Sequence, residues 1–441
     1  MVLDLKSNLI AKSEGDASDV VRAEETIRIR FLLLPLFVFT ASSAWAQTIA
    51  IRAGRLIDPA KGTVAKDQTI LVKSEKIVEV GANLEIPGDA EIVDLSSSWV
   101  MPGLMDAHTH VTEGQRNWEL ELSYLYEDSA YRALRGLKTA QVLLNAGITT
   151  VRDVGNDANY AAVDLRKAIK QGWFTGPTIL TAGKIIGPFG GQSNGASVEM
   201  GPYWRFEYID ADGPDEISKA VRQNVFYGVD LIKLVADSSR SYYSVEEIRT
   251  AVEVAHSAGL AVAVHVVESE PAKNVILGGA DSIEHGFFLS DEVLHLMKER
   301  GTMLVGTDFP SEHLVAGGQD TAEKAKALGN TIIERLRRAY RIGVKMGFGT
   351  DIVVDLPNMT RADMTWDYLP VWRAAGVPAA EILKCLTTND AELLRINKQR
   401  RAIAPGLAAD IVAAPSNPLD DIETLRKINF VIKDGKIVRR P

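Results

Sequence analysis

Four of the seven histidines of this chain stand where a short apolar segment ends, and together they could hold metal ions. They are His108, His110, His265 and His285. Side chains at positions i and i+2 share one face of a strand, so His108 and His110 can direct two imidazoles at one divalent ion. A single histidine at such a place is more often an ordinary polar residue, but four of them favour a metal site.

Two more ionisable residues stand in similar places. Lys233 lies inside the apolar segment 229–235, where an unpaired ammonium should not be buried. A carboxylate partner could neutralise it; alternatively, a deprotonated lysine can take up carbon dioxide and become a carbamate that bridges two metal ions. Asp351 follows Gly349 and Thr350, and its carboxylate could bind a metal and accept a proton, although the same three residues alone would indicate a capped turn.

The remaining candidates carry weaker signals. His256 and His295 fall within helical patterns and are expected to pack or face solvent, whereas His313 follows an expected strand and is a candidate for substrate contact. Cys385, the single cysteine, lies in a helical pattern and is expected to be a buried apolar residue without a catalytic role.

Elements that could position these residues alternate between about residue 99 and residue 397. Short apolar strands and amphipathic helices follow one another there, which is the pattern of a (β/α)₈ barrel, and barrel active sites lie at the carboxyl ends of the strands. A capping box at Ser244 predicts one of these helices up to residue 255. The eight expected strands are residues 100–108, 149–153, 178–183, 231–235, 261–265, 282–285, 303–305 and 347–351.

Both ends of the mature chain lack this alternation of strands and helices. Residues 47–98 and 398–441 read as short strands and turns, including a hairpin around Asp434 and Gly435. We expect the two ends to combine into one small β-sandwich beside the barrel of residues 99–397.

The first 46 residues look like a leader that is removed. Arg28 and Arg30 precede an apolar run from Phe31 to Phe39, and an Ala-x-Ala site ends at Ala46. This pattern predicts a cleaved signal peptide and a periplasmic or secreted protein without a membrane span in its mature form. The net charge of −9 is spread along the chain without a basic stripe, which argues against nucleic-acid binding.

Taken in order, these motifs resemble the amidohydrolase superfamily over essentially the whole mature chain. They are Pro102-Gly103-Leu104, His108-x-His110, Lys233, His265, Glu284-His285-Gly286 and Gly349-Thr350-Asp351. The likeness is closest to the imidazolonepropionase-related branch, which contains Xaa-Pro dipeptidases and ochratoxin-hydrolysing amidohydrolases. It implies an α/β fold with a (β/α)₈ TIM barrel, amide hydrolysis and a homo-oligomer.

The resemblance also assigns roles at the site. It implies two divalent metal ions, usually zinc: one held by His108, His110 and Asp351, one by His265 and His285, and both joined by carboxylated Lys233. A bridging hydroxide would attack the amide carbonyl while Asp351 takes its proton and passes it to the leaving amine.

The substrate side departs from relatives at one position. Gln192 stands where they often have a histidine that touches the substrate carbonyl, and further candidates for substrate contact are Arg240, Tyr242 and Tyr243. The expected substrate is a small amide with a free carboxylate, such as a dipeptide or an N-acyl amino acid, ochratoxin A included.

Two other functions compete with this interpretation. His265-x-x-Glu268 matches a motif of mononuclear deaminases and cyclic-amidine hydrolases, in which the glutamate moves protons. Such enzymes do not need Lys233, and two ions per chain would contradict this alternative. A periplasmic binding protein that has lost its chemistry is the second alternative, and the complete set of candidate ligands argues against it.

Overall fold

The computed structural model describes residues 47–114, 126–155, 158–192, 198–238 and 241–441. The predicted leader, residues 1–46, and Arg240 lie outside the described residues. Within the described part, no helix combines the length and the apolar character that a membrane crossing needs.

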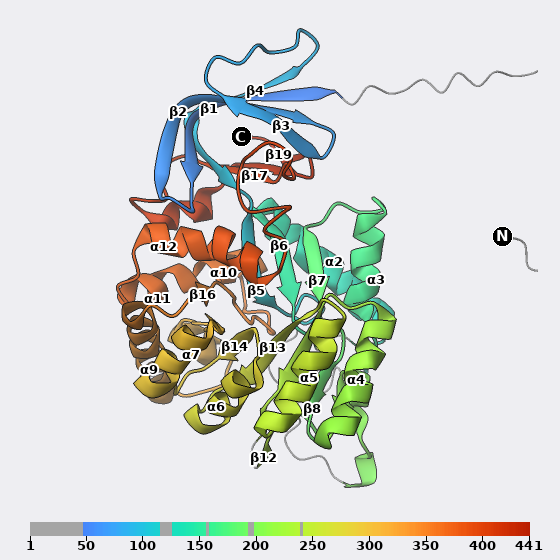
Figure 1. Ribbon diagram of the computed structural model, residues 1–441. Coiled ribbons are helices and arrows are strands. Elements are labelled where there is room, and N and C mark those ends of the chain that lie inside the picture. The colour runs from blue at the N-terminus through green and yellow to red at the C-terminus, as the bar shows by residue number, and fades with distance from the viewer. Residues whose placement is uncertain (1–46, 115–125, 156–157, 193–197, 239–240) are drawn as a thin grey trace, which may run out of the picture. The chain divides into compact units, whose positions relative to one another are not determined.

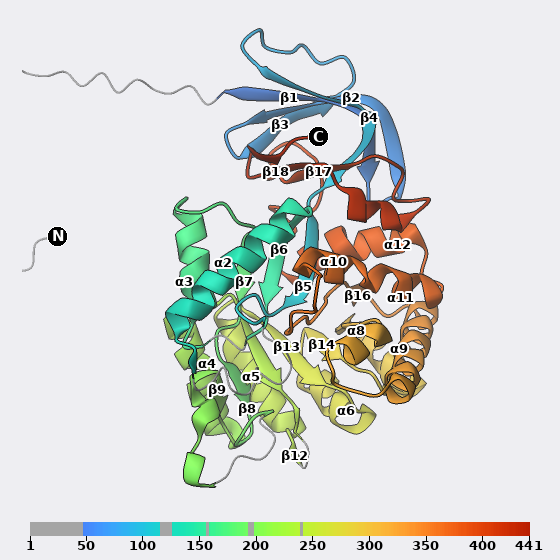
Figure 2. The same ribbon diagram turned by 180° about the vertical axis from the view of Figure 1, so that it is seen from behind.

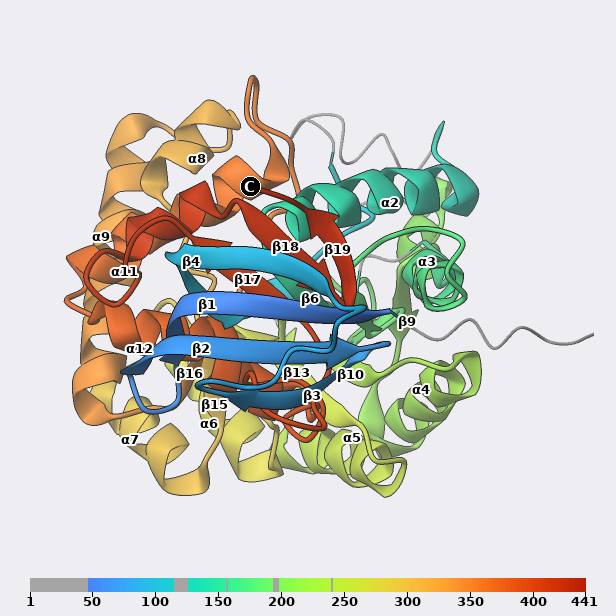
Figure 3. The ribbon, with the colours of Figure 1, turned by 90° about the horizontal axis from the view of Figure 1, so that it is seen from above.

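Strands from both ends of the chain lie side by side in one sheet. β4 pairs with β1 in parallel and with β17 in antiparallel register, and the order is β19-β18-β17-β4-β1-β2-β3, as Figure 3 shows from above. The expected union of the two ends is thus present, but its strands form one seven-stranded sheet and the predicted sandwich of two sheets is not shown. The strands are β1 (Thr48–Asp58), β2 (Thr63–Lys73), β3 (Lys76–Gly81), β4 (Glu91–Pro102), β17 (Ile411–Ala414), β18 (Phe430–Lys433) and β19 (Lys436–Arg439).

Parallel strands form the central part of the fold. β5 (Leu104–Thr109), β6 (Ile148–Asp153) and β7 (Thr178–Thr181) make one sheet. A second sheet has the order β16-β15-β14-β13-β10-β8-β9. Backbone hydrogen bonds join the two sheets at both sides, from Asp230 N to Thr181 O at 2.8 Å and from Ala107 N to Phe348 O at 2.7 Å. The second sheet comprises β8 (Ile185–Gly187), β9 (Tyr208–Asp210), β10 (Leu231–Val235), β13 (Ala261–Val266), β14 (Ser282–His285), β15 (Met303–Val305) and β16 (Met346–Gly347).

Five of the eight expected strands have other limits in the structure, three of them by only one or two residues at one end and two of them by more. The segment 100–108 is divided at Gly103, so that its first residues belong to β4 and only the rest forms β5. Gly103 lets the backbone approach β6 closely, since a Cβ at this position would lie 2.1 Å from Thr149 Oγ1. The last strand is only Met346–Gly347: the next backbone N–H, that of Phe348, donates to Asp390 Oδ1 at 3.1 Å, and Asp351 has a left-handed φ of 58°.

Helices alternate with these strands and cover the outside of the parallel sheets, as Figures 1 and 2 show from opposite sides. The capping box predicted at Ser244 is present at the start of α5, which ends at Ser257. The helices are α2 (Ser129–Asn145), α3 (Ala161–Lys170), α4 (Gly213–Tyr227), α5 (Val245–Ser257), α6 (Ser269–Gly278), α7 (Asp291–Arg300), α8 (Ser311–Ala316), α9 (Ala322–Ile342), α10 (Arg361–Trp366), α11 (Tyr368–Ala374), α12 (Ala379–Lys384) and α13 (Asp390–Leu393).

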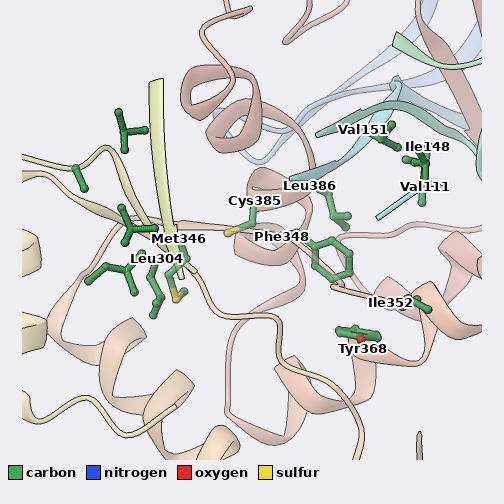
Figure 4. Close-up of a cluster of buried hydrophobic side chains, with 14 of the residues drawn as sticks. Val111, Ile148, Val151, Leu304, Met346, Phe348, Ile352, Tyr368, Cys385 and Leu386 are labelled. Carbon is green, nitrogen blue, oxygen red and sulfur yellow. The ribbon is translucent and has the colours of Figure 1, made fainter. Parts of the chain in front are cut away.

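The apolar core lies between the strands and this layer of helices. Figure 4 shows part of it, in which Cys385 lies among buried apolar side chains. Cys385 opens a short π-helical turn, Cys385–Asn389, and is completely buried. The expectation of a buried packing residue is therefore confirmed, and burial raises the pKa of its thiol well above the usual value.

Candidate active site

The parallel register brings the predicted site residues to one end of the strands. On β10 and β13, Val235 is opposite His265, and on β13 and β14, Val266 is opposite His285. The rings of His265 and His285 are 4.3 Å apart between centroids, and those of His108 and His285 are 5.0 Å apart. Residues separated by up to 177 positions in the sequence therefore share one small volume.

Asp351 lies at the centre of this group. Its Oδ1 is 3.3 Å from His108 Nε2 and 3.0 Å from His110 Nε2, and its Oδ2 is 3.5 Å from His285 Nδ1. Burial opposes ionisation of Asp351, but the imidazoles around it, His108 first, hold its pKa well below the usual value. Asp351 is therefore a carboxylate that faces three imidazoles.

Most of the imidazoles are neutral in this environment. Burial and the nearby Lys233 ammonium lower the pKa of His265 to about 3, and burial also lowers the pKa of His108 and of His285. At His110, burial is outweighed by the hydrogen bond to Asp351, and the pKa rises. Neutral imidazole is the form that can bind a metal ion through its lone pair.

Lys233 is buried on β10, with 2% of its surface exposed. No hydrogen bond or ion pair joins its ammonium to any residue in the described part of the chain. Burial lowers the pKa of Lys233 to about 8, although the charges of Glu284 and Asp351 oppose this. The carboxylate partner that would be the simpler interpretation is thus not in contact with it, and burial favours the uncharged amine of Lys233 more than in water.

Buried polar groups hold the first two histidines in place. His108 Nδ1 donates to Glu284 Oε2 at 2.6 Å, and Glu284 is itself held by Arg152, whose Nη2 lies 2.8 and 2.9 Å from the two carboxylate oxygens. His110 Nδ1 donates to the carbonyl oxygen of Gly155 at 3.0 Å. Because both contacts hold a proton on Nδ1, the neutral form of each ring directs an unprotonated Nε2 toward Asp351.

The loops around the site adopt unusual backbone conformations. His285, Thr307 and Asp351 all have positive φ, at 72°, 46° and 58°. Non-glycine residues rarely adopt this region, and such conformations cluster at functional sites. Thr307 Oγ1 lies 2.8 Å from His285 Nδ1, and buried Asp106 accepts hydrogen bonds from the backbone N–H and the hydroxyl of Thr350, next to Asp351.

The donor set fits a divalent metal ion. His108, His110 and Asp351 each offer one ligand atom, and these atoms lie within 4.8 Å of one another. His108 Nε2 is completely buried and has no hydrogen-bond partner among the described residues. A buried, unprotonated nitrogen beside a second imidazole and a carboxylate is the environment in which zinc is bound in proteins.

The predicted substrate contacts have mixed outcomes. Gln192 reaches the site, with its Nε2 3.3 Å from both ring nitrogens of His265 and its Oε1 accepting a hydrogen bond from Tyr208 at 3.2 Å. Tyr242 is 58% exposed on β12 (Ser241–Tyr242) and remains available to a ligand. Tyr243 is buried and its hydroxyl donates to the carbonyl oxygen of Ala211 at 2.7 Å, so its predicted contact with substrate is corrected to a packing role.

Two other predicted residues lie at the edge of this group or outside it. His313 on α8 is held by Asp367, with 3.1 Å between Nε2 and Oδ2. Glu268, the residue on which the deaminase alternative depends, is exposed and stands at the N-cap of α6.

The sequence interpretation missed the polar residues that support the ligands. Glu284 and Arg152 both lie inside segments expected to be buried strands, and the argument applied to Lys233 could have singled them out. Asp106, which is completely buried in the motif before His108, is likewise a charged residue in a segment expected to be an apolar strand. What the sequence could not show is that Arg152 and Glu284 contact each other across 132 positions.

Comparisons with known proteins agree with this geometry. The amidohydrolase family model matches residues 99–438. A crystal structure of a Xaa-Pro dipeptidase with bound methionine in its active site is 32% identical, has a TM-score of 0.80, and is matched over 89% of this chain and 100% of that chain. Ochratoxinase of Aspergillus niger is 26% identical over 91% of this chain and 88% of its own length, and its crystal structure has a TM-score of 0.77 with 90% and 96% coverage.

These relatives confirm the resemblance seen in the motifs and imply an α/β fold of the TIM-barrel type. The family acts on small molecules, and its relatives here are a dipeptidase and an ochratoxinase. The chain therefore belongs to the amidohydrolase family and is a hydrolase that acts on amide bonds.

Proposed function

We propose that this protein is a binuclear metal-dependent amide hydrolase that releases a C-terminal amino acid from small dipeptides or N-acyl amino acids. The observation that carries the proposal is the convergence of four histidines and Asp351 around a lysine that has no carboxylate partner in the described part of the chain. The substrate class rests on the relatives, which include a prolidase complexed with N-methylphosphonate-L-proline, 25% identical with a TM-score of 0.78, and ochratoxinase. Ochratoxin A, an N-acyl phenylalanine, belongs to this class.

The candidate ligands divide into two groups. His108, His110 and Asp351 would hold one ion, most simply zinc, His265 and His285 would hold the other, and Lys233 as a carbamate would contact both. The uncharged amine of Lys233 forms that carbamate by attacking carbon dioxide with loss of one proton, which creates an N–C bond and an anionic carboxylate. Divalent ions at these positions would polarise the amide carbonyl and lower the pKa of a water molecule.

The chain's own residues handle protons and orientation. Asp351 is ionised and can accept a proton from the attacking water and deliver it to the leaving nitrogen. Glu284 holds the proton of His108 on Nδ1, which keeps Nε2 free. Gln192 can donate a hydrogen bond to the substrate, in the place where relatives often have a histidine.

Metal content per chain tests this proposal most directly. We expect about two zinc ions in purified wild-type protein, and a sharp fall together with loss of amidase activity in Lys233→Ala. Lys433→Ala is the matched control, because Lys433 is also a buried lysine but is paired with the carboxylate of Asp410. One ion in both wild type and Lys233→Ala would favour the Glu268-dependent deaminase, and no tightly bound metal would exclude the mechanism.

A panel of substrates tests the second half of the proposal. The zinc-loaded protein should cleave dipeptides or N-acyl amino acids that end in a free carboxylate, and it should spare the corresponding C-terminal amides. Failure on the whole panel would exclude the proposed substrate class while leaving the metal centre intact.

Three further features belong to this proposal. We propose that residues 1–46 direct export and are cut after Ala46, that the mature enzyme is a homo-oligomer in the periplasm or outside the cell, and that its parallel strands close into a complete (β/α)₈ barrel beside the β-sandwich. The intact mass of protein recovered from the periplasm or medium would show the cleavage site, and sedimentation would give the oligomeric state.

A further inference from the structure

The segment after β10 places an unexplained carboxylate beside the site. Asp237 opens β11 (Asp237–Ser238), and 9% of its side chain is exposed. Its Oδ2 accepts hydrogen bonds from Val267 N at 2.7 Å and from Glu268 N at 3.3 Å. Its Oδ1 is buried and accepts no hydrogen bond from any described residue, and it lies 3.5 Å from His265 Nε2.

Strand pairing, and not a chance loop conformation, determines this juxtaposition. Val235 is opposite His265 in the register of β10 and β13, and Ala236 N donates to the carbonyl oxygen of His265 at 2.9 Å. Asp237 then pairs with Tyr242 across the small sheet β11-β12. The carboxylate is thus held on both sides, by its own strand and by the backbone after β13.

A buried carboxylate oxygen without a donor carries a desolvation cost that a hydrogen bond removes. His265 Nε2, 3.5 Å away, is a candidate donor, and a neutral imidazole carries one proton, on either nitrogen. If that proton is on Nε2, a shift of a few tenths of an ångström gives Asp237 Oδ1 its missing hydrogen bond. Nδ1 is then the nitrogen with the free lone pair.

We propose that Asp237 is a positioning residue for His265, which holds the proton on Nε2 and presents Nδ1 to the second ion. This inference rests on the proposed function, in which His265 binds that ion. Gln192 is consistent with it, because its Nε2 lies 3.3 Å from both ring nitrogens and can donate only to the unprotonated one. His108 and His110 present the opposite nitrogen, since their Nδ1 atoms donate to Glu284 and Gly155.

The chain offers a matched control for a test of this role. Asp281 makes the same kind of contact at the other end of β13: its Oδ2 accepts from Val262 N at 2.7 Å and lies 2.8 Å from His256 Nε2. Asp237→Ala removes a carboxylate that joins the backbone N–H just after β13 to a histidine. Asp281→Ala removes one that joins a β13 N–H to a histidine and also pairs with Arg395. Only Asp237 faces the site.

The measurement is zinc per chain in the purified holoenzyme after dialysis against graded concentrations of a chelator. We expect Asp237→Ala to bind one of its two ions about 10- to 100-fold more weakly and to retain the other, since residues that orient a ligand contribute to affinity on this scale. Asp237→Asn should keep part of this affinity, because its amide oxygen can still accept from Nε2. Asp281→Ala should bind both ions like wild type, whatever its unfolding temperature.

The outcomes separate this inference from the proposed function. Wild-type protein with fewer than two ions would overturn the proposed function, and the assignment of Asp237 with it. Two ions in wild type and unchanged affinity in Asp237→Ala would refute the Asp237 assignment alone. Equal weakening in Asp237→Ala and Asp281→Ala would also refute it, because the effect would then come from disturbed folding of β13.

Discussion

The substitution Glu284→Gln provides a sharp test of how the site is supported. Glu284 is completely buried, and its two oxygens accept from His108 Nδ1, from Arg152 Nη2 and from Ser282 Oγ, the last at 2.5 Å. An amide of the same size has one oxygen and one NH₂ group. If its oxygen faces Arg152, its NH₂ faces His108 Nδ1 and forces the proton of that ring onto Nε2. If the oxygen of the glutamine faces His108 instead, its NH₂ group faces Arg152 Nη2, so that two donor groups meet.

The size of the effect follows from the loss of the charge. Arg152 is 2% exposed, and removing the partner of a buried ion pair costs about 3–5 kcal/mol because the remaining charge is uncompensated. The charge of Arg152 and the hydrogen bond from His108 outweigh burial and lower the pKa of Glu284 from 4.5 to about 2. At about 1.4 kcal/mol per pKa unit, that shift corresponds to about 3 kcal/mol, so both arguments agree.

Denaturant unfolding of zinc-free protein at pH 7 measures this loss without any contribution from metal binding. We expect Glu284→Gln to lower the free energy of unfolding by about 3 kcal/mol and to weaken zinc binding about 10- to 100-fold. Adding Arg152→Leu should recover part of the stability, since it removes the uncompensated charge. A loss below about 1 kcal/mol with unchanged zinc content would refute the argument that this pair supports His108.

Two further predictions concern buried charges that are not themselves candidate ligands. Burial and the carboxylate of Glu207 raise the pKa of Glu113 from 4.5 to about 7, so its contribution to stability is complete below pH 4.5 and is lost as the pH rises through 7. Between pH 4.5 and 7, wild type should therefore lose about 3 kcal/mol of unfolding free energy relative to Glu113→Gln. Urea titrations of both proteins at several pH values measure this difference. Parallel plots of unfolding free energy against pH would contradict the prediction. Asp410→Asn should lower the free energy of unfolding by about 3 kcal/mol, because the ammonium of Lys433, whose Nζ is 3.0 Å from Asp410 Oδ2, then loses part of the negative charge that neutralises it. The kcat at 25 °C should not change. An unchanged midpoint of thermal unfolding would contradict this prediction.

The sequence predicted the central strands best where they are buried on both faces. The segments 231–235, 282–285 and 303–305 match β10, β14 and β15 at both ends, because continuous apolar runs leave little doubt about their limits. The prediction failed where a contact with a residue distant in the sequence accompanies the limit. At Gly103 the division coincides with a close approach to Thr149, and at the end of β16 the N–H of Phe348 donates to the side chain of Asp390.

The candidate ligands were predictable because their side chains leave a mark in the sequence. A histidine or a lysine in an apolar strand is costly to bury, so its presence indicates a purpose. The supporting contacts were not predictable in the same way, since Glu284 must meet His108 and Arg152, residues that come more than 130 positions earlier. Tyr243 shows the opposite error: an aromatic residue beside the site was interpreted as a substrate contact, although its hydroxyl is directed into the fold.

The charges beneath the site connect the lysine to the number of metal ions. The charges that act on Lys233 are those of Glu284, Asp351 and Arg152, and with Lys233 protonated these four groups balance one another. Two divalent ions placed in this balanced pocket would leave a large uncompensated positive charge in a poorly solvated volume. Conversion of Lys233 to a carbamate changes its charge from positive to negative and offsets half of that excess. In the proposed binuclear centre the carbamate form of Lys233 would therefore be favoured, whereas a single ion could be accommodated by loss of the lysine proton alone. For this reason the zinc content of Lys233→Ala distinguishes a binuclear from a mononuclear centre more clearly than any activity measurement could.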